Sequence, residues 1–197
     1  MRKLYFVLLT TWLVFGANGA MTAQNLAEAQ KLFVELQAEK TSDRATDQLR
    51  VVAKQNPDAR EFLTAQLPTL IENTRGRVLE NAVHLTGDLK IVEAISVLVK
   101  LLKDPYTKGG ITNFEIANRL GDDPPGRALA DIGESATEAV GALLRDQNRN
   151  IRWRAALVLG NINSAHADQL LESRLPDEND PAVRTEIQSR LGEHRKG

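Results

Sequence analysis

The chain has 197 residues, with 25 lysine and arginine side chains against 26 aspartate and glutamate side chains, and it contains no cysteine. This near balance of charge gives no electrostatic reason to expect nucleic acid or anionic lipid as a partner. Without cysteine the chain can form neither a disulfide framework nor a thiol-linked lipid anchor, so packing must supply its stability.

The first twenty residues predict export. Arg2 and Lys3 precede an apolar run over 4–15, and small residues over 16–20 follow it. This is the layout of a secretory signal peptide, and the run is shorter than the roughly 20 residues that cross a membrane. We expect cleavage near residues 19–23, a periplasmic or secreted product, and no membrane attachment afterwards. Removal of 1–20 leaves 23 basic against 26 acidic residues, a net charge of −3.

After this leader, apolar residues recur at steps of three and four rather than two, which predicts helices throughout. In 21–75 we expect three N-terminal helices. Leu26, Phe33 and Leu36 lie on one face of the first, and the second covers about 44–54. The third begins at Asn56-Pro57, a capping residue followed by a first-turn proline.

Residues 76–197 read as repeated units of helix, glycine and helix. Gly87, Gly133 and Gly160 are expected to separate the two helices of three successive units, and a final half-unit ends at Gly192. Gly160 and Gly192 are 32 residues apart. A period in the thirties made of two helices is typical of an α-solenoid, because one amphipathic pair cannot bury its apolar faces alone. The predicted fold class is therefore all-α, a short α-solenoid of antiparallel helix pairs.

The segment NIRWRAALVLG over 150–160 resembles the first helix of a bacterial HEAT-like repeat of the phycobilin-lyase type. The resemblance covers about 76–194. It implies a ladder of hydrogen bonds between successive repeats, made by a loop acid and an arginine six residues later. Asp146 with Arg152 and Glu178 with Arg184 have this spacing. In the first unit Asp104 is followed by Gly110 instead, so we expect the ladder to be interrupted there.

Catalysis and metal binding have no support in the sequence. His84, His166 and His194 lie on separate units without converging ligands, and no phosphate-binding loop or nucleophile motif occurs. We expect neither a cofactor nor an enzyme. The acidic runs 122–123 and 177–180 are expected to be turns and helix caps rather than calcium sites.

Trp153 stands among the three arginines of 149–154, a superficially basic patch with an aromatic residue. Export and the negative charge of the mature chain argue against nucleic acid. We therefore expect Arg152 to serve the ladder and Trp153 to pack between repeats.

The segment 104–126 is an insertion of unusual length between two helices, and such loops are usually functional or disordered. Tyr106, Lys108 and Phe114 in this loop are candidate contacts for a partner, although Phe114 can equally pack against the solenoid. On the second helices of the pairs, the candidate contacts are Glu93, Lys100 and Glu138, with Ser96 and Thr137 among the same polar positions.

We therefore expect an exported, non-catalytic scaffold that binds another protein through the concave face of the solenoid and the loop 104–126. The alternative is an accessory or lyase-like protein that holds a small apolar molecule between its helices. Self-association through an uncapped end remains open. The polar residues Arg184, Glu186, Gln188 and Arg190 on the last helix favour a monomer.

Overall fold

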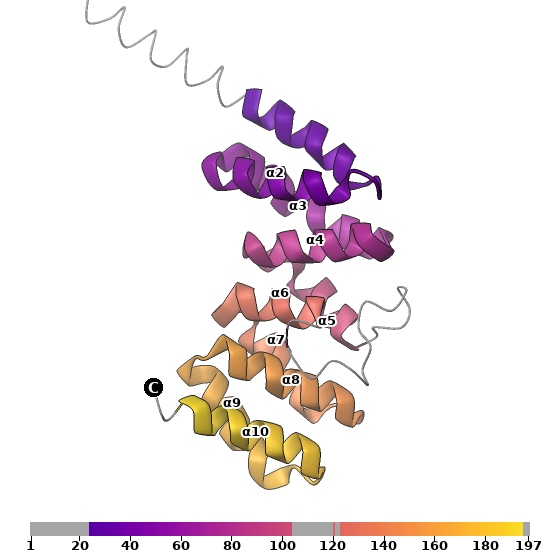
Figure 1. The fold of residues 1–197 in the computed structure, drawn as a ribbon. Coiled ribbons are helices and arrows are strands. Elements are labelled where there is room, and N and C mark those ends of the chain that lie inside the picture. Colours follow the sequence, from indigo (N-terminus) through magenta and orange to yellow (C-terminus); the bar gives the residue numbers. More distant parts are fainter. Residues whose placement is uncertain (1–23, 104–119, 121–122, 195–197) are drawn as a thin grey trace, which may run out of the picture. The chain divides into compact units, whose positions relative to one another are not determined.

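The structure, a computed structural model, describes residues 24–103, 120 and 123–194. Contacts divide the chain into two compact units, Met1–Leu63 and Thr64–Gly197. The regular elements of the described residues are α-helices and short 3-10 helices, without a strand (Figure 1). None of the described helices combines the length and apolar character needed to cross a membrane. The expected signal peptide and most of the loop 104–126 lie outside the described residues.

The first unit contains a helix over 24–36, α2 (Ser42–Gln55) and the start of α3 (Pro57–Asn73), which continues into the second unit. The rings of Phe33 and Phe62 meet edge to face, with centroids 5.5 Å apart. At the start of α3, the Asn56 side chain accepts a hydrogen bond of 2.8 Å from the Ala59 amide. The capping residue and first-turn proline expected there therefore begin the helix.

The second unit consists of helix pairs in two layers. The first helices are α4 (Gly76–Asp88), α6 (Pro124–Ile132), α8 (Arg149–Ile162) and α10 (Pro181–His194). The second helices are α5 (Ile95–Lys103) with η1 (Val92–Ala94), α7 (Thr137–Gly141) between η3 (Gly133–Ala136) and η4 (Ala142–Arg145), and α9 (Ala165–Arg174) with η5 (Leu175–Asp177).

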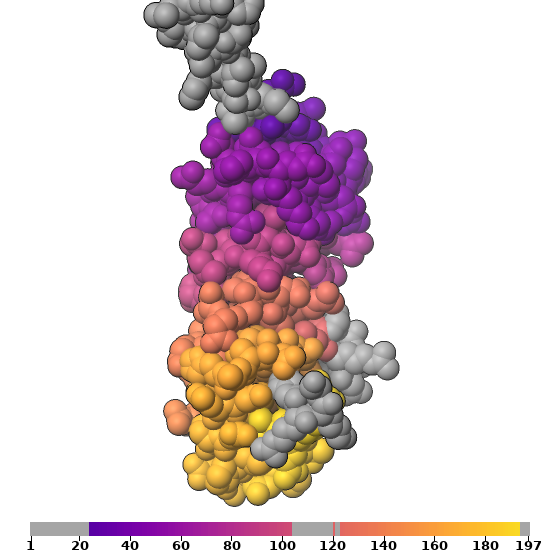
Figure 2. All heavy atoms as spheres, turned by 90° about the vertical axis from the view of Figure 1, so that its left-hand side faces the viewer, coloured from indigo at the N-terminus to yellow at the C-terminus, as the bar shows by residue number. Residues whose placement is uncertain are grey.

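Each helix of this unit packs on its counterpart in the next pair. In the first layer α4 contacts α6, α6 contacts α8 and α8 contacts α10, while α5 contacts α7 and α7 contacts α9 in the second layer. Figure 2 shows the successive elements of this unit as bands in chain order. The predicted fold class, a short α-solenoid, is confirmed.

The core of the second unit is built from small and medium apolar side chains, as thin stacked layers require. Its fully buried members include Leu79, Leu85, Leu98, Leu102, Leu129, Val140, Val158, Leu171 and Ile187. Within one helix the buried residues recur at three- and four-residue steps, as Val183, Ile187 and Leu191 of α10 do, so the spacing that predicted the helices also locates their buried faces.

The predicted role of the glycines was wrong at three of four positions. Gly87, Gly160 and Gly192 lie inside α4, α8 and α10, and only Gly133 of these four follows its helix as a break, with φ +83°. The chain reverses after α4 and α8 at Lys90 and Asn163 instead, both in the left-handed region with φ 51° and 52°.

Two of these helical glycines have a packing role. A Cβ at Gly87 would lie 2.8 Å from the Cα of Ala128 in α6, and a Cβ at Gly160 would overlap the side-chain stem of Arg190 in α10. The missing side chain thus lets successive first helices approach closely. At Gly87 and Gly160 the glycine therefore marks a close approach of helices rather than a turn.

Candidate functional site

A ladder of charged contacts joins α8 to the loop before α10. The Arg152 guanidinium donates to both carboxylate oxygens of Glu178, at 2.8 and 3.0 Å, and to the backbone carbonyl of Asp146 at 2.9 Å. Arg184 donates to the backbone carbonyl of Glu178 at 3.0 Å. Each arginine therefore contacts the carbonyl of the acid six residues earlier. The Glu178 carboxylate reaches the arginine of the preceding repeat.

Hydrogen bonds hold the acids of the ladder in their charged form. Burial raises the pKa of the Glu178 carboxyl, but hydrogen bonds from Arg152, the Asp180 amide and Arg174 outweigh burial and lower the pKa to about 2. The pKa of Asp146 is lowered mainly by the Asn148 amide, and also by Lys103 at 3.2 Å. Lys103, at the end of α5, thus faces Asp146. The repeat formed by α4 and α5 is the one that lacks the ladder arginine.

A second charged contact, which the sequence did not indicate, joins α8 to the start of α6. Arg154 and Asp123 are both 1% exposed, and the Arg154 guanidinium donates to the two Asp123 carboxylate oxygens at 2.6 and 2.5 Å. Arg154 also donates to the backbone carbonyl of Leu102 at the end of α5. Asp123 further caps α6 by accepting from the Gly126 amide at 3.0 Å. Arg154 is thus a buried structural residue and not part of a basic surface.

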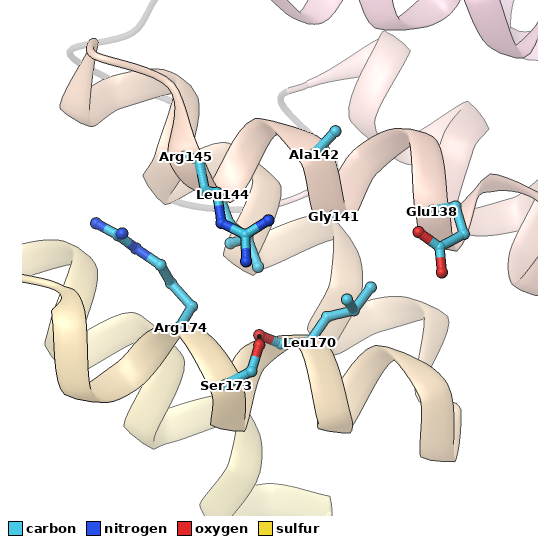
Figure 3. A pocket seen from close by; sticks show the side chains of 8 residues that line it. All are labelled: Glu138, Gly141, Ala142, Leu144, Arg145, Leu170, Ser173 and Arg174. Atoms are coloured by element: carbon cyan, nitrogen blue, oxygen red, sulfur yellow. Dashed lines mark hydrogen bonds between the residues drawn. The ribbon is translucent and has the colours of Figure 1, made fainter.

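A groove lies between α7–η4 and α9, the second helices of two consecutive repeats (Figure 3). Its volume is about 150 Å³. The residues that line it are Glu138, Gly141, Ala142, Leu144, Arg145, Leu170, Ser173 and Arg174. A Cβ at Gly141 would lie 2.5 Å from the Leu170 Cδ1, so this wall of the groove needs glycine to leave room for Leu170. The groove therefore forms only because the two repeats approach closely here.

Opposite charges mark the two ends of this groove. Figure 3 shows Arg145 and Arg174 toward one end and Glu138 at the other. Arg174 donates to Glu178 at 2.9 Å, whereas exposed Arg145 has no hydrogen-bond or ion-pair partner among the residues that the structure describes. The groove can thus offer guanidinium donors to an acceptor at the arginine end.

His166 of α9 contacts the residues at the glutamate end of the groove. Its Nε2 lies 2.8 Å from a carboxylate oxygen of Glu138, and its Nδ1 lies 3.1 Å from Glu134. The pKa of Glu134 is lowered by a hydrogen bond from the Ser164 hydroxyl and by His166. His166 thereby links the second helices of two repeats beside the groove.

The predicted contact residues are only partly brought together. Glu93, Lys100 and Glu138 are exposed, but only Glu138 of these lines the groove, and Lys100 pairs with Glu72 at 3.2 Å. The prediction that Thr137 is a contact position was wrong. Its side chain is fully buried, and its hydroxyl has no partner within the described part of the chain. Tyr106, Lys108 and Phe114 lie outside the described residues.

A second groove, of about 440 Å³, lies near the C-terminal end between α9–η5 and α10. It is lined by Glu172, Leu175, Pro176, Gln188, Leu191 and Gly192. Arg190, expected among the exposed polar residues of the last helix, instead lays its stem against Gly160 of α8. Within the described ranges no cluster of three or more acidic, histidine or cysteine residues is arranged to hold a metal ion.

Comparison with known proteins bears on the region that holds both grooves. Residues 126–192 match the family model described as HEAT repeats. This part of the chain is HEAT-like. No curated protein matches the chain. Among solved structures, the chain is similar to the crystal structure of an engineered protein, a Northeast Structural Genomics Consortium target. The identity is 20% and the TM-score 0.38, over 85% of this chain and 96% of that chain.

Sequence reasoning missed the arginines of the groove. Arg145 closes η4 and Arg174 closes α9, each in the last turn of the second helix of its repeat in the HEAT-like region. Basic residues commonly occupy the last turn of a helix, where they face its negative dipole end, so neither position stands out alone. Aligning the two repeats by their second helices, rather than by their glycines, would have placed the two arginines on neighbouring helix ends.

Proposed function

We propose that this chain is an exported, non-catalytic scaffold that binds another protein through the second-helix layer of its HEAT-like region. HEAT repeats commonly mediate protein–protein interaction, and stacked helix pairs present extended binding surfaces. The resemblance to repeats of the phycobilin-lyase type fits this proposal without adding a reaction to it.

The observation that carries the proposal is the groove between α7–η4 and α9. Its volume of about 150 Å³ is below the roughly 300–1,000 Å³ of pockets that take small ligands and cofactors. A cavity of this size in another protein holds one benzene-sized group. The groove therefore admits one apolar side chain of a larger partner, whose neighbouring groups contact the ends of the groove, and Glu93 and Lys100 lie on the same layer for peripheral contacts.

Export is supported by the sequence of the leader, whose residues lie outside the described part of the chain. Arg2 and Lys3, the apolar run 4–15 and the small residues 16–20 have the order of a signal peptide. A mature chain starting within 20–23, found by intact mass in the periplasmic or secreted fraction, supports this part. An uncleaved chain in the cytosol would overturn it.

The scaffold is tested with a photo-crosslinking amino acid at Ala142, an exposed position in the groove wall. The matched position is Arg127, exposed on α6 in the first-helix layer. After exposure to an envelope and supernatant extract, we expect one protein to crosslink from position 142 and not from position 127. A Tyr106→Ala, Phe114→Ala variant tests the predicted contribution of the loop. Absence of any position-specific crosslink from 142, 93 and 100 would overturn the scaffold.

The ligand-holding alternative draws on the second groove. Its volume of about 440 Å³ falls within the range of ligand pockets, and Leu175, Pro176 and Leu191 give it apolar walls. A pigment or lipid that co-purifies with the chain, and is lost in a Leu175→Asp variant of equal helicity, would favour this alternative.

A further inference from the structure

The arginine end of the groove between α7–η4 and α9 carries more positive charge than its neighbours neutralise. One carboxylate, Glu178, receives hydrogen bonds from both Arg152 and Arg174. Two guanidinium groups thus share a single negative charge, and Arg145 adds a further positive charge to the same end. Two neighbouring acids are engaged elsewhere, since Asp146 pairs with Lys103 and Asp180 with Arg149.

Hydrogen-bond donors are in excess at this end as well. Arg174 uses its Nε and Nη2 on Glu178, at 3.3 and 2.9 Å, and its Nη1 makes no hydrogen bond with a described residue. A guanidinium has five N–H donors and no acceptor. The Ser173 hydroxyl donates to the Leu170 carbonyl at 2.8 Å, so its proton is also in use. An occupant of this end must therefore supply acceptors, and a carboxylate supplies them in the geometry that guanidinium groups match.

The walls between the two ends are apolar. Leu144 and Leu170 line the groove together with Ala142 and the bare backbone of Gly141. Glu138 stands at the opposite end, with its side chain 77% exposed, and it repels a second acidic group. The groove thus favours one acidic side chain beside an apolar one over a run of acidic residues.

We propose that this groove binds a protein segment in which an Asp or Glu side chain lies next to an apolar side chain. The carboxylate sits at Arg145 and Arg174, and the apolar group lies against Leu144 and Leu170. Charge complementarity selects this occupant, because the described residues offer Arg145 and the Nη1 of Arg174 no acceptor, and the opposite end already carries a carboxylate. The inference rests on the proposed scaffold and specifies the chemistry of its partner.

The test selects binders from a display library of short random peptides on the purified full chain. We expect selected peptides to share an Asp or Glu beside Leu, Ile, Val or Phe. For a labelled peptide of the consensus, Arg145→Gln should weaken binding about tenfold, as should Asp→Asn or Glu→Gln in the peptide, because hydrogen bonds to charged groups are among the stronger ones. The two changes together should cost little more than either alone.

The control is Arg127→Gln, which alters net charge equally on α6, outside the groove. It should leave affinity unchanged, and both variants should keep the helical circular dichroism of the parent. Selected peptides without an acidic residue, or equal losses from Arg145→Gln and Arg127→Gln, overturn the inference. If the crosslinked partner still binds the Arg145→Gln variant, the proposed scaffold is supported and this inference is contradicted. If acidic peptides bind the groove but no protein is crosslinked, the groove chemistry is supported and the proposed scaffold is contradicted.

Discussion

The two sides of α8 are fastened to their neighbours by different kinds of charged contact. Toward α10, Arg152 is 14% exposed and shares Glu178 with Arg174. Toward α6, Arg154 and Asp123 are each 1% exposed, and Arg154 donates to Asp123 and to the Leu102 carbonyl. The first is a network at the rim of the helix layers, whereas the second is an ion pair inside the protein.

This difference determines what each contact does for the fold. When Arg152 is lost, Glu178 keeps a second arginine, Arg174. When Arg154 is lost, Asp123 keeps the neutral Gly126 amide but no counter-charge among the described residues. Asp123 lies toward the end of the insertion 104–126 and caps α6, so it is not a ladder residue. At this irregular joint both partners of the ion pair are buried, and the energetic consequence can be measured.

The largest expected effect comes from breaking the buried pair. Arg154→Met leaves Asp123 buried without its counter-charge, and we expect a loss of about 3–5 kcal/mol in the free energy of unfolding. Arg152→Met should cost only about 1–2 kcal/mol, because Glu178 keeps its bonds to Arg174 and the Asp180 amide. Urea unfolding of the full chain, followed by circular dichroism, measures both.

The double variant Asp123→Ala, Arg154→Met serves as the control for this comparison. It removes both buried charges and should recover a substantial part of the loss, apart from about 1 kcal/mol for the missing helix cap. Equal losses from Arg154→Met and Arg152→Met would contradict the distinction between the two joints.

The rim network should respond to pH. The pKa of Glu178 is lowered from its ordinary 4.5 to about 2 in the folded chain. Its stabilising contribution is therefore present above about pH 5 and is lost as pH falls toward 2. The shift corresponds to at most about 3 kcal/mol. We expect the difference in unfolding free energy between the parent and Glu178→Gln to shrink over this window.

The plateau above pH 6 provides the reference for the pH series. The difference between the parent and Glu178→Gln should be constant above pH 6, where Glu178 is charged in both folded and unfolded chains. A difference that stays constant down to pH 3 would mean that the carboxylate of Glu178 is not held in its charged form by the network.

The helices could be predicted from the sequence because their buried faces recur at fixed spacing, as Leu98, Leu129 and Val158 illustrate. The ladder acids and arginines also have a fixed local spacing. The Arg154–Asp123 pair joins residues 31 positions apart across the end of an irregular insertion, so no repeat period indicates it. The arginine end of the groove likewise arises from helix ends in different repeats, and it exists only after the repeats stack.

The spacing of the glycines correctly indicated a repeat, but the interpretation of these glycines as turns between helices was wrong. Gly160 lies where α10 packs against α8, whereas Gly192, one period later, has no such neighbour, and the turn that follows α8 is made by Asn163 in the left-handed region. Asparagine tolerates that conformation, so a glycine is not required there. A periodic glycine therefore indicates a repeated close contact as readily as a repeated turn.

The smallest effects should come from glycines at the two joints of α8. A Cβ at Gly126 would lie 2.8 Å from a carboxylate oxygen of the buried Asp123 and 3.1 Å from Val158, neither of which can move freely. A Cβ at Gly160 would meet the stem of Arg190 and would lie 2.8 Å from its Cβ, which cannot move without the backbone of α10. We expect each change to cost about 2 kcal/mol, since overpacking is offset only partly by the higher helix propensity of alanine.

Gly192→Ala is the matched control, because nothing lies within 4 Å of the position that its Cβ would occupy. Freed from overpacking, this change should stabilise the chain by about 0.5 kcal/mol through backbone entropy alone. Thermal unfolding of the three alanine variants separates the contributions. Losses at Gly126 and Gly160 together with a gain at Gly192 follow from two joints with close neighbours and a position with space for a methyl group. If Gly160→Ala proved neutral, Arg190 and the backbone of α10 would yield to the added methyl group, and the rim joint would be the less rigid of the two sides of α8.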